Sequence, residues 1–117
     1  IVGVADVSGL RVLLAGDAEP TGQAVALRAA REVGVSLQAQ VLKLPHHGSS
    51  RQEPRFFAAS GATLAVASAG EGNSYGHPAA SALDLARSMG MDIARTDTQG
   101  AIAVSLQDGV LTVRTSG

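Results

Sequence analysis

The sequence predicts an α/β protein built on a mixed sheet, and three observations support this prediction. Apolar residues make up 45% of the chain, which is enough for a core. Short apolar runs typical of strands alternate with segments whose apolar residues recur at helical spacing. The resulting order is strand, strand, helix, strand, helix, strand, helix and three strands, and this order favours an α/β fold with a mixed sheet.

Local signals set the bounds of each expected element. Ser8-Gly9 and Asp108-Gly109 are turn dipeptides between strand-like runs and indicate hairpins. Pro20 opens one helix, Gly34 ends it, and Pro78 suits the first turn of another helix. The expected strands are residues 2–7, 11–15, 40–44, 63–68, 91–95, 101–106 and 110–114, and the expected helices are residues 20–33, 53–59 and 78–89.

Composition limits the classes of function. The 117 residues suffice for one domain, so we treat residues 1–117 as a single, partial domain. A formal net charge of -1 argues against nucleic-acid binding by bulk electrostatics, because that mode needs clustered Lys and Arg. The absence of cysteine excludes a disulfide framework and a Cys-based zinc site. No apolar run approaches the ~20 residues that cross a bilayer, and the chain reads as a piece of a longer protein because it begins without Met.

Three loops at the carboxyl ends of expected strands hold the candidate chemical groups. Asp17 directly follows the run RVLLA, His46 and His47 follow QVLKL, and His77 lies before an expected helix. Each has an ordinary alternative: Asp17 could cap the next helix, His46 and His47 could be solvated loop residues, and His77 could only cap its helix. Two adjacent histidines in an extended segment point different ways, so one is expected to bind a metal and the other to do a separate task. Gly48 would let the backbone pass close to the site.

Taken together, these residues predict a metal site. All three histidines of the chain fall in loops where α/β sheets place their chemistry. Nitrogen and oxygen ligands without sulfur fit Zn or Mn. Because catalytic zinc usually has three protein ligands, a site with Asp17, one of His46 or His47, and His77 as a possible third is short of ligands. Glu19 is expected to be solvated and Arg51 to be a surface residue, while Asp97 is expected to be a turn residue that supports the following strand.

Four motifs in order resemble the metallo-β-lactamase superfamily and, within it, the ComEC-type DNA-uptake (competence) proteins. They are LLAGDAE (13–19), LKLPHHGSS (42–50), NSYGHP (73–78) and RTDTQGAI (95–102). The resemblance implies that the chain is the carboxy-terminal half of an αββα sandwich, with helices on one face of a mixed sheet. It implies that Asp17 and His47 are metal ligands, that His46 and His77 are catalytic, and that Ser49 and Tyr75 contact substrate.

The chain lacks one motif that is typical of this family. The HxHxDH-type motif, which supplies most metal ligands of the family, is absent. Alone, the chain is therefore expected to bind Zn or Mn weakly or not at all and to be inactive. The intact domain would hold two metal ions and act on DNA as a phosphodiesterase or nuclease. Its parent protein would lie in the plasma membrane, with this domain on one side.

Two alternatives remain beside the nuclease hypothesis. The same motifs could serve a hydrolase of another phosphodiester or ester, such as a choline phosphoester. The chain could also be a non-catalytic half-domain. In that case one sheet face would be bare, and the chain would associate with the rest of its parent or form a homo-oligomer through that face.

Overall fold

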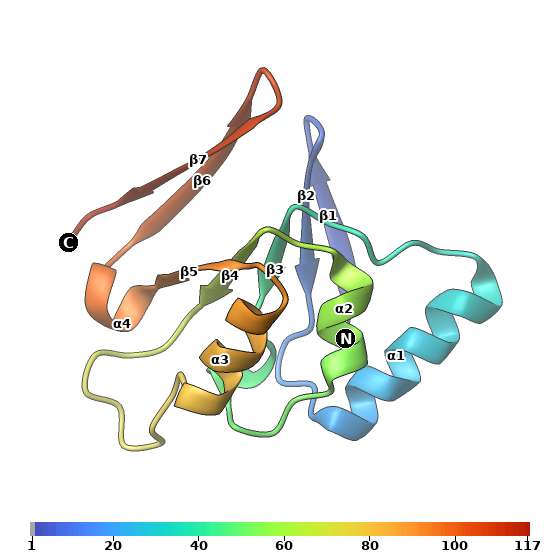
Figure 1. Cartoon of the computed structure of the whole chain (residues 1–117), viewed down its shortest axis with the longest axis horizontal. Helices are drawn as coiled ribbons and strands as arrows, with labels where there is room; N and C mark the ends of the chain where they lie inside the picture. The colour runs from blue at the N-terminus through green and yellow to red at the C-terminus, as the bar shows by residue number, and fades with distance from the viewer. Residues whose placement is uncertain (1) are drawn as a thin grey trace.

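The computed structural model describes residues 2–117 and arranges their strands in a five-stranded sheet and a two-stranded hairpin (Figure 1). The elements in chain order are β1 (Gly3–Val7), β2 (Leu10–Leu14), α1 (Pro20–Val33), β3 (Val41–Lys43), the 3-10 turn η1 (Pro45–Gly48), α2 (Pro54–Ser60), β4 (Leu64–Ala67), α3 (Ala80–Ser88), β5 (Asp92–Arg95), α4 (Thr96–Gln99), β6 (Ile102–Gln107) and β7 (Val110–Thr115). The predicted order of elements is confirmed, and the short η1 and α4 are additional.

The topology of the large sheet places its three long helices on one face. The strand order is β1-β2-β3-β4-β5, with β1 antiparallel to β2 and the remaining neighbours parallel. Each parallel strand is added in the same direction, so right-handed crossovers put every connecting helix on the same side. Figure 1 shows α1, α2 and α3 on this side. The predicted α/β class, the mixed sheet and the helices on one face are therefore confirmed.

The main core lies between this face of the sheet and the helices. Phe56 and Phe57 of α2 are completely buried and are its largest side chains. They pack in one cluster with aliphatic residues of the central strands and α3, among them Leu13, Leu42, Leu44, Ala65, Leu83 and Ala86. Two phenylalanines thus anchor a core that is otherwise filled by Ala, Leu and Val, as the aromatic content of 3% requires.

The β6–β7 hairpin lies against the other face of the sheet. Val41, Leu64 and Ala94 are buried on that face and cluster with hairpin residues that include Ile102, Val104 and Leu111. The expectation of a bare sheet face is wrong for this part of the sheet, because the last two strands form a separate sheet that covers it. The predicted Asp108-Gly109 turn closes the hairpin, and both residues have the positive φ of a tight hairpin turn, 51° and 76°.

The start of α3 differs from the prediction. The helix begins at Ala80 with Ala79 as its N-cap, so Pro78 lies outside it. Pro78 is instead buried, where it closely approaches Gly48. Among the helices of residues 2–117, none combines the length and the apolar character that crossing a bilayer requires.

Replacing Phe56 by alanine tests whether α2 anchors the core. Phe56 is 0% exposed, and removal of a buried phenylalanine side chain costs about 3–5 kcal/mol. We expect Phe56→Ala to lower the free energy of unfolding by about that amount in urea titrations followed by circular dichroism. Val33→Ala is the control, because Val33 is 72% exposed and should change the same quantity by less than about 0.5 kcal/mol. Equal effects of the two substitutions would contradict this packing.

Candidate functional site

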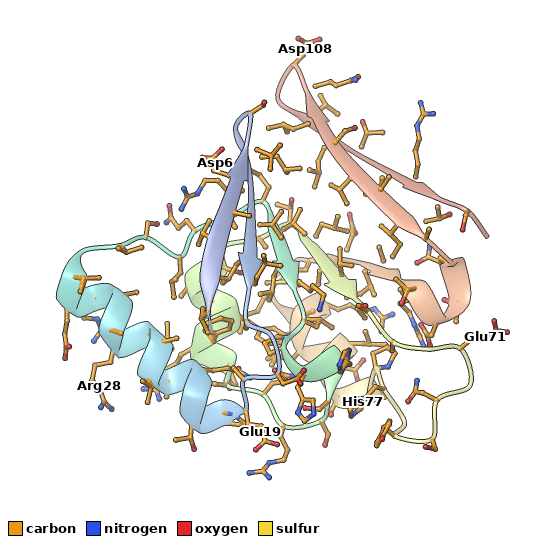
Figure 2. All side chains as sticks on the ribbon, turned by 180° about the vertical axis from the view of Figure 1, so that it is seen from behind. Asp6, Glu19, Arg28, Glu71, His77 and Asp108 are labelled. Carbon is orange, nitrogen blue, oxygen red and sulfur yellow. The ribbon has the colours of Figure 1, made fainter. Side chains whose placement is uncertain are left out.

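The candidate residues converge at one edge of the sheet. Asp17 follows β2, His46 and His47 follow β3, and the loop that carries His77 follows β4. Because these strands are parallel, their carboxyl ends meet at the same edge. Figure 2 shows Glu19 and His77 at this edge, far from the β1–β2 turn marked by Asp6. The predicted convergence of Asp17 with the three histidines is confirmed, and the distances below define it.

The imidazole of His47 is oriented by the backbone of the next loop. Its Nδ1 lies 2.8 Å from the carbonyl oxygen of Ser68. A carbonyl only accepts hydrogen bonds, so Nδ1 must carry the proton and a neutral ring has an unprotonated Nε2. This Nε2 lies 3.5 Å from Oδ1 of Asp17. Two acceptor atoms therefore face each other, and a cation between them would stabilise the arrangement.

His46 faces the second carboxylate of the same loop. Its Nδ1 lies 3.7 Å from Oε1 of Glu19, and this buried nitrogen has no hydrogen-bond partner among the described residues. The His46 ring centroid is 5.6 Å from that of His77 and 6.3 Å from that of His47. Glu19 is exposed, as predicted, with 49% of its side chain accessible to solvent. The structure also places it beside His46, at the edge of the site. In the sequence, the position of Glu19 two residues after Asp17 could have indicated that both carboxylates lie at the site.

The two histidines lie in an unusual backbone conformation. Both have positive φ, 51° for His46 and 55° for His47, within the short turn η1. Non-glycine residues adopt this region at a cost of roughly 1–3 kcal/mol and do so most often at functional sites. The expectation of an extended segment is therefore wrong, although the two rings do diverge, with planes 60° apart. The turn results from Pro45, which opens it, and Gly48, which ends it.

Gly48 permits the close contact between the two histidine loops. It has φ of +80°, and a Cβ there would lie 2.7 Å from Cβ of Pro78. The Gly48 carbonyl accepts a hydrogen bond of 2.7 Å from the backbone of Ala79. The η1 turn and the segment before α3 are thus in close contact, and a residue larger than glycine at position 48 would prevent it. The predicted role of Gly48 in a close backbone approach is confirmed.

Two glutamines that the sequence analysis missed hold η1 in place. The Gln52 amide donates to the carbonyl oxygens of Pro45 and Ser49, at 3.0 and 2.9 Å. Gln23, fully buried on α1, donates to the side chain of Gln52 and accepts from the backbone of Glu53. The one available signal was Gln23 itself, a polar residue four positions before Leu27 on the apolar side of its helix.

Asn73 holds the third loop and was also missed. Its side chain accepts from the backbone nitrogens of Tyr75 and His77 and donates to the carbonyl oxygens of Gly70 and His77. These bonds fix His77, which lies two residues before the N-cap of α3 and not at the helix terminus as predicted.

The base of the third loop is held by the segment after β5. The Thr96 hydroxyl donates to the carbonyl oxygen of Ala69 at 2.8 Å and accepts from its backbone nitrogen at 2.9 Å. Asp97 binds Arg95 through two hydrogen bonds, of 3.0 and 2.8 Å. The hydrogen bonds from Arg95 lower the pKa of Asp97 and raise the pKa of Arg95. Asp97 is thus a structural residue in the helical turn α4, but it binds the preceding strand β5 and not the following strand that it was predicted to support.

A small cleft of about 180 Å³ opens beside His47 and His77. Its other lining residues are Ala69, Gly70, Asn73 and Tyr75. The Tyr75 ring stacks on His77 with centroids 5.8 Å apart and is 81% exposed. Ser49, the other predicted substrate contact, is buried and donates to the carbonyl oxygen of Arg51 at 3.3 Å. Its hydroxyl therefore supports the loop, and Ser49, buried directly after η1, is not among the residues that line the cleft.

The possible metal-ligand atoms of the site form two carboxylate–imidazole pairs, Asp17 with His47 and Glu19 with His46. Within residues 2–117, no group of three or more His, Asp or Glu side chains is arranged to hold a metal ion. Asp17 with His47 forms the closer pair, at 3.5 Å against 3.7 Å for Glu19 with His46, and the hydrogen bond of Nδ1 to Ser68 leaves Nε2 as the atom that faces the carboxylate. The site is open to solvent, with half of the His47 side chain and 74% of the Asp17 side chain exposed.

Fold and site together define an α/β domain with an aspartate–histidine pair at the carboxyl edge of its parallel strands. The chain is similar in sequence to competence proteins. Competence protein ComA of Neisseria gonorrhoeae is 34% identical over 102 residues, which cover 86% of this chain and 14% of that protein. ComE operon protein 3 of Bacillus subtilis (strain 168) is 32% identical over 98 residues, which cover 83% of this chain and 12% of that protein.

The comparisons thus confirm the competence-protein part of the predicted resemblance. The chain spans less than one sixth of the length of either relative, 14% and 12%. No protein-family model and no solved structure matches the chain significantly. The assignment to the metallo-β-lactamase superfamily stays a prediction.

Replacing Gly48 by alanine tests the close approach of the two loops. The added Cβ would lie 2.7 Å from Pro78 at a positive φ, so we expect a destabilisation of about 3 kcal/mol in urea unfolding. Gly109→Ala is the matched control, because Gly109 also has positive φ but nothing within 4 Å of the added atom. It should cost only about 1 kcal/mol. Equal losses would show that the Pro78 contact is unimportant.

Proposed function

We propose that the chain is the carboxy-terminal half of a metallo-β-lactamase-type domain in a competence protein, and that the intact domain is a metal-dependent phosphodiesterase that acts on DNA during uptake. The alignment of His47 with Asp17 at the carboxyl edge of the sheet is the observation that carries this proposal. The similarity to two competence proteins supports the biological context. In this proposal the parent lies in the plasma membrane, and DNA and the remainder of the parent are the partners of this domain.

The geometry of the Asp17–His47 pair fits a shared Zn or Mn ion. Two ligand atoms at about 2.0–2.1 Å from a zinc ion in tetrahedral arrangement lie roughly 3.4 Å apart. The observed separation between Asp17 Oδ1 and His47 Nε2 is 3.5 Å. Metal-binding histidines commonly donate their second ring nitrogen to a carbonyl or carboxylate, as His47 does to Ser68. The donor set therefore suits the metal that the resemblance implies.

In the proposed reaction, the other side chains act on the substrate. A bound metal ion supplies Lewis-acid activation of water and of the phosphoryl oxygens. His46 and His77, with ring centroids 5.6 Å apart, are the groups that could hold a proton for the leaving oxygen. Glu19 would orient His46 through Nδ1. Tyr75, stacked on His77, would form the outer wall of the cleft.

This chain offers too few metal ligands for a catalytic site, which supports the proposal that only the longer parent protein is active. A catalytic zinc site usually has three protein ligands, and the described residues offer pairs only. The relatives are far longer than this chain. We propose that residues of the parent protein outside the 117 of this chain supply the missing ligands, through a motif of the HxHxDH type.

Replacing Asp17 in the parent protein tests the function. We expect Asp17→Ala to lower metal-dependent cleavage of DNA at least about 100-fold, because one ligand and its charge are lost. Glu71→Ala is the matched control, since it removes the same charge from an exposed position that Figure 2 shows away from His77. Duplex DNA, single-stranded DNA and a choline phosphoester should be assayed side by side with Zn and Mn.

Two results of this assay would contradict the proposal. One is full cleavage by the Asp17→Ala protein. The other is wild-type cleavage that continues after a chelator has removed the metal. Hydrolysis of the choline phosphoester without cleavage of DNA would support the metal site but contradict the proposal that DNA is the substrate.

A further inference from the structure

A groove between α1 and α2 gathers arginines that the proposed reaction does not use. The two helices pack side by side (Figure 1). The groove has a volume of about 480 Å³ and is lined by Arg28 and Arg31 from α1 and by Arg55 from α2. Between these side chains its walls are small or apolar, formed by Ala24, Leu27, Ala58 and Ala59. All three arginine side chains reach solvent.

Charge is distributed unevenly along the chain and is positive on this segment. Residues 20–60 contain five basic side chains, Arg28, Arg31, Lys43, Arg51 and Arg55, and two acidic ones, Glu32 and Glu53, which gives +3. The whole chain carries -1, so the remaining residues sum to -4. The near-neutral total therefore conceals a locally basic surface, where arginines are clustered as phosphate binding requires.

The arginines differ in how strongly they are already paired. Arg55 donates from Nε to Oε1 of Glu53 at 2.7 Å, and this contact raises the pKa of Arg55 and lowers that of Glu53. No carboxylate lies within ion-pair distance of Arg28 or Arg31 among residues 2–117. Two guanidinium groups one helical turn apart are therefore free to bind an anion, while the third is held in place beside them.

We infer that this groove binds the phosphodiester backbone of a nucleic acid strand. Planar guanidinium groups recognise phosphate oxygens with two parallel hydrogen bonds. Successive phosphates repeat along a strand, which suits a row of arginines better than a single phosphate ion does. The alanine-rich walls leave room for a backbone to approach, and the absence of aromatic residues in the groove gives no surface for base stacking. Binding should therefore be independent of base sequence.

The groove leads toward the candidate site through a shared segment. The residues before α2 include Gln52, which bonds to η1, and Glu53, which caps α2 and holds Arg55. The segment that holds Arg55 at the groove is thus the same segment that holds the turn with the histidines. Only the identity of the strand as DNA rests on the proposed function, because the affinity of the groove for phosphates does not require metal or catalysis.

Binding of a fluorescein-labelled 12-nucleotide oligothymidylate to the whole chain, followed by fluorescence anisotropy in 50 mM salt, tests this inference. We expect the double variant Arg28→Gln/Arg31→Gln to bind about tenfold more weakly than wild type. With three arginines engaged, the slope of log K against log salt for a single strand should be about -2, and the double variant should reduce it to about -0.7. A mixed-sequence oligonucleotide of the same length should bind equally well.

Two further variants make the test specific to the groove. Arg87→Gln/Arg114→Gln removes the same charge from α3 and β7 and should change the affinity less than about twofold. Glu53→Gln frees Arg55 while keeping an oxygen that can cap α2, so it should tighten binding severalfold. Circular dichroism of each variant confirms that the fold is intact.

Three outcomes would overturn the inference: no binding by wild type, equal losses in the two double variants, or no change in the salt slope. Asp17→Ala separates this inference from the proposed function. That variant should keep full affinity for the oligonucleotide, whether or not the parent protein cleaves DNA.

Discussion

The carbonyl oxygen of Ser68 fixes the imidazole of His47, and the arrangement of the site depends on this one hydrogen bond. The bond assigns the ring proton to Nδ1 and turns the lone pair of Nε2 toward Asp17. A carboxylate and a lone pair at 3.5 Å repel each other unless a proton or a metal ion lies between them. Ser68 directly follows β4, so the carbonyl that orients the imidazole is positioned by the end of a sheet strand.

The rest of the edge supports that hydrogen bond. Gly48 and Pro78 bring the η1 turn against the third loop, and Gln52 and Asn73 satisfy the backbone groups of these two irregular segments. Buried amide side chains are stabilising only when their partners are present. These contacts hold both loops in place, while the side chains of Asp17 and His47 stay open to solvent.

Sequence patterns predicted the elements and the convergence because both follow from the order of the parallel strands. Patterns of apolar residues located all seven strands and the three longer helices, and the carboxyl ends of β2, β3 and β4 then had to meet. The positive φ of His46 and His47, the direction of the Ser49 hydroxyl and the roles of Gln23, Gln52 and Asn73 were not predictable. Each depends on contacts between segments far apart in the chain, which local patterns do not contain.

Nitrogen-15 NMR of the His47 imidazole is the most direct measurement of the central interaction. In long-range proton–nitrogen spectra recorded where the rings are neutral, the account predicts that Nδ1 of His47 is protonated and Nε2 is not. Because the chain offers only two ligands, zinc is added in large excess, and it should then shift the Nε2 resonance of His47 in the wild-type chain and much less in Asp17→Ala. A proton on Nε2, or an identical response of the two proteins to zinc, would contradict the account.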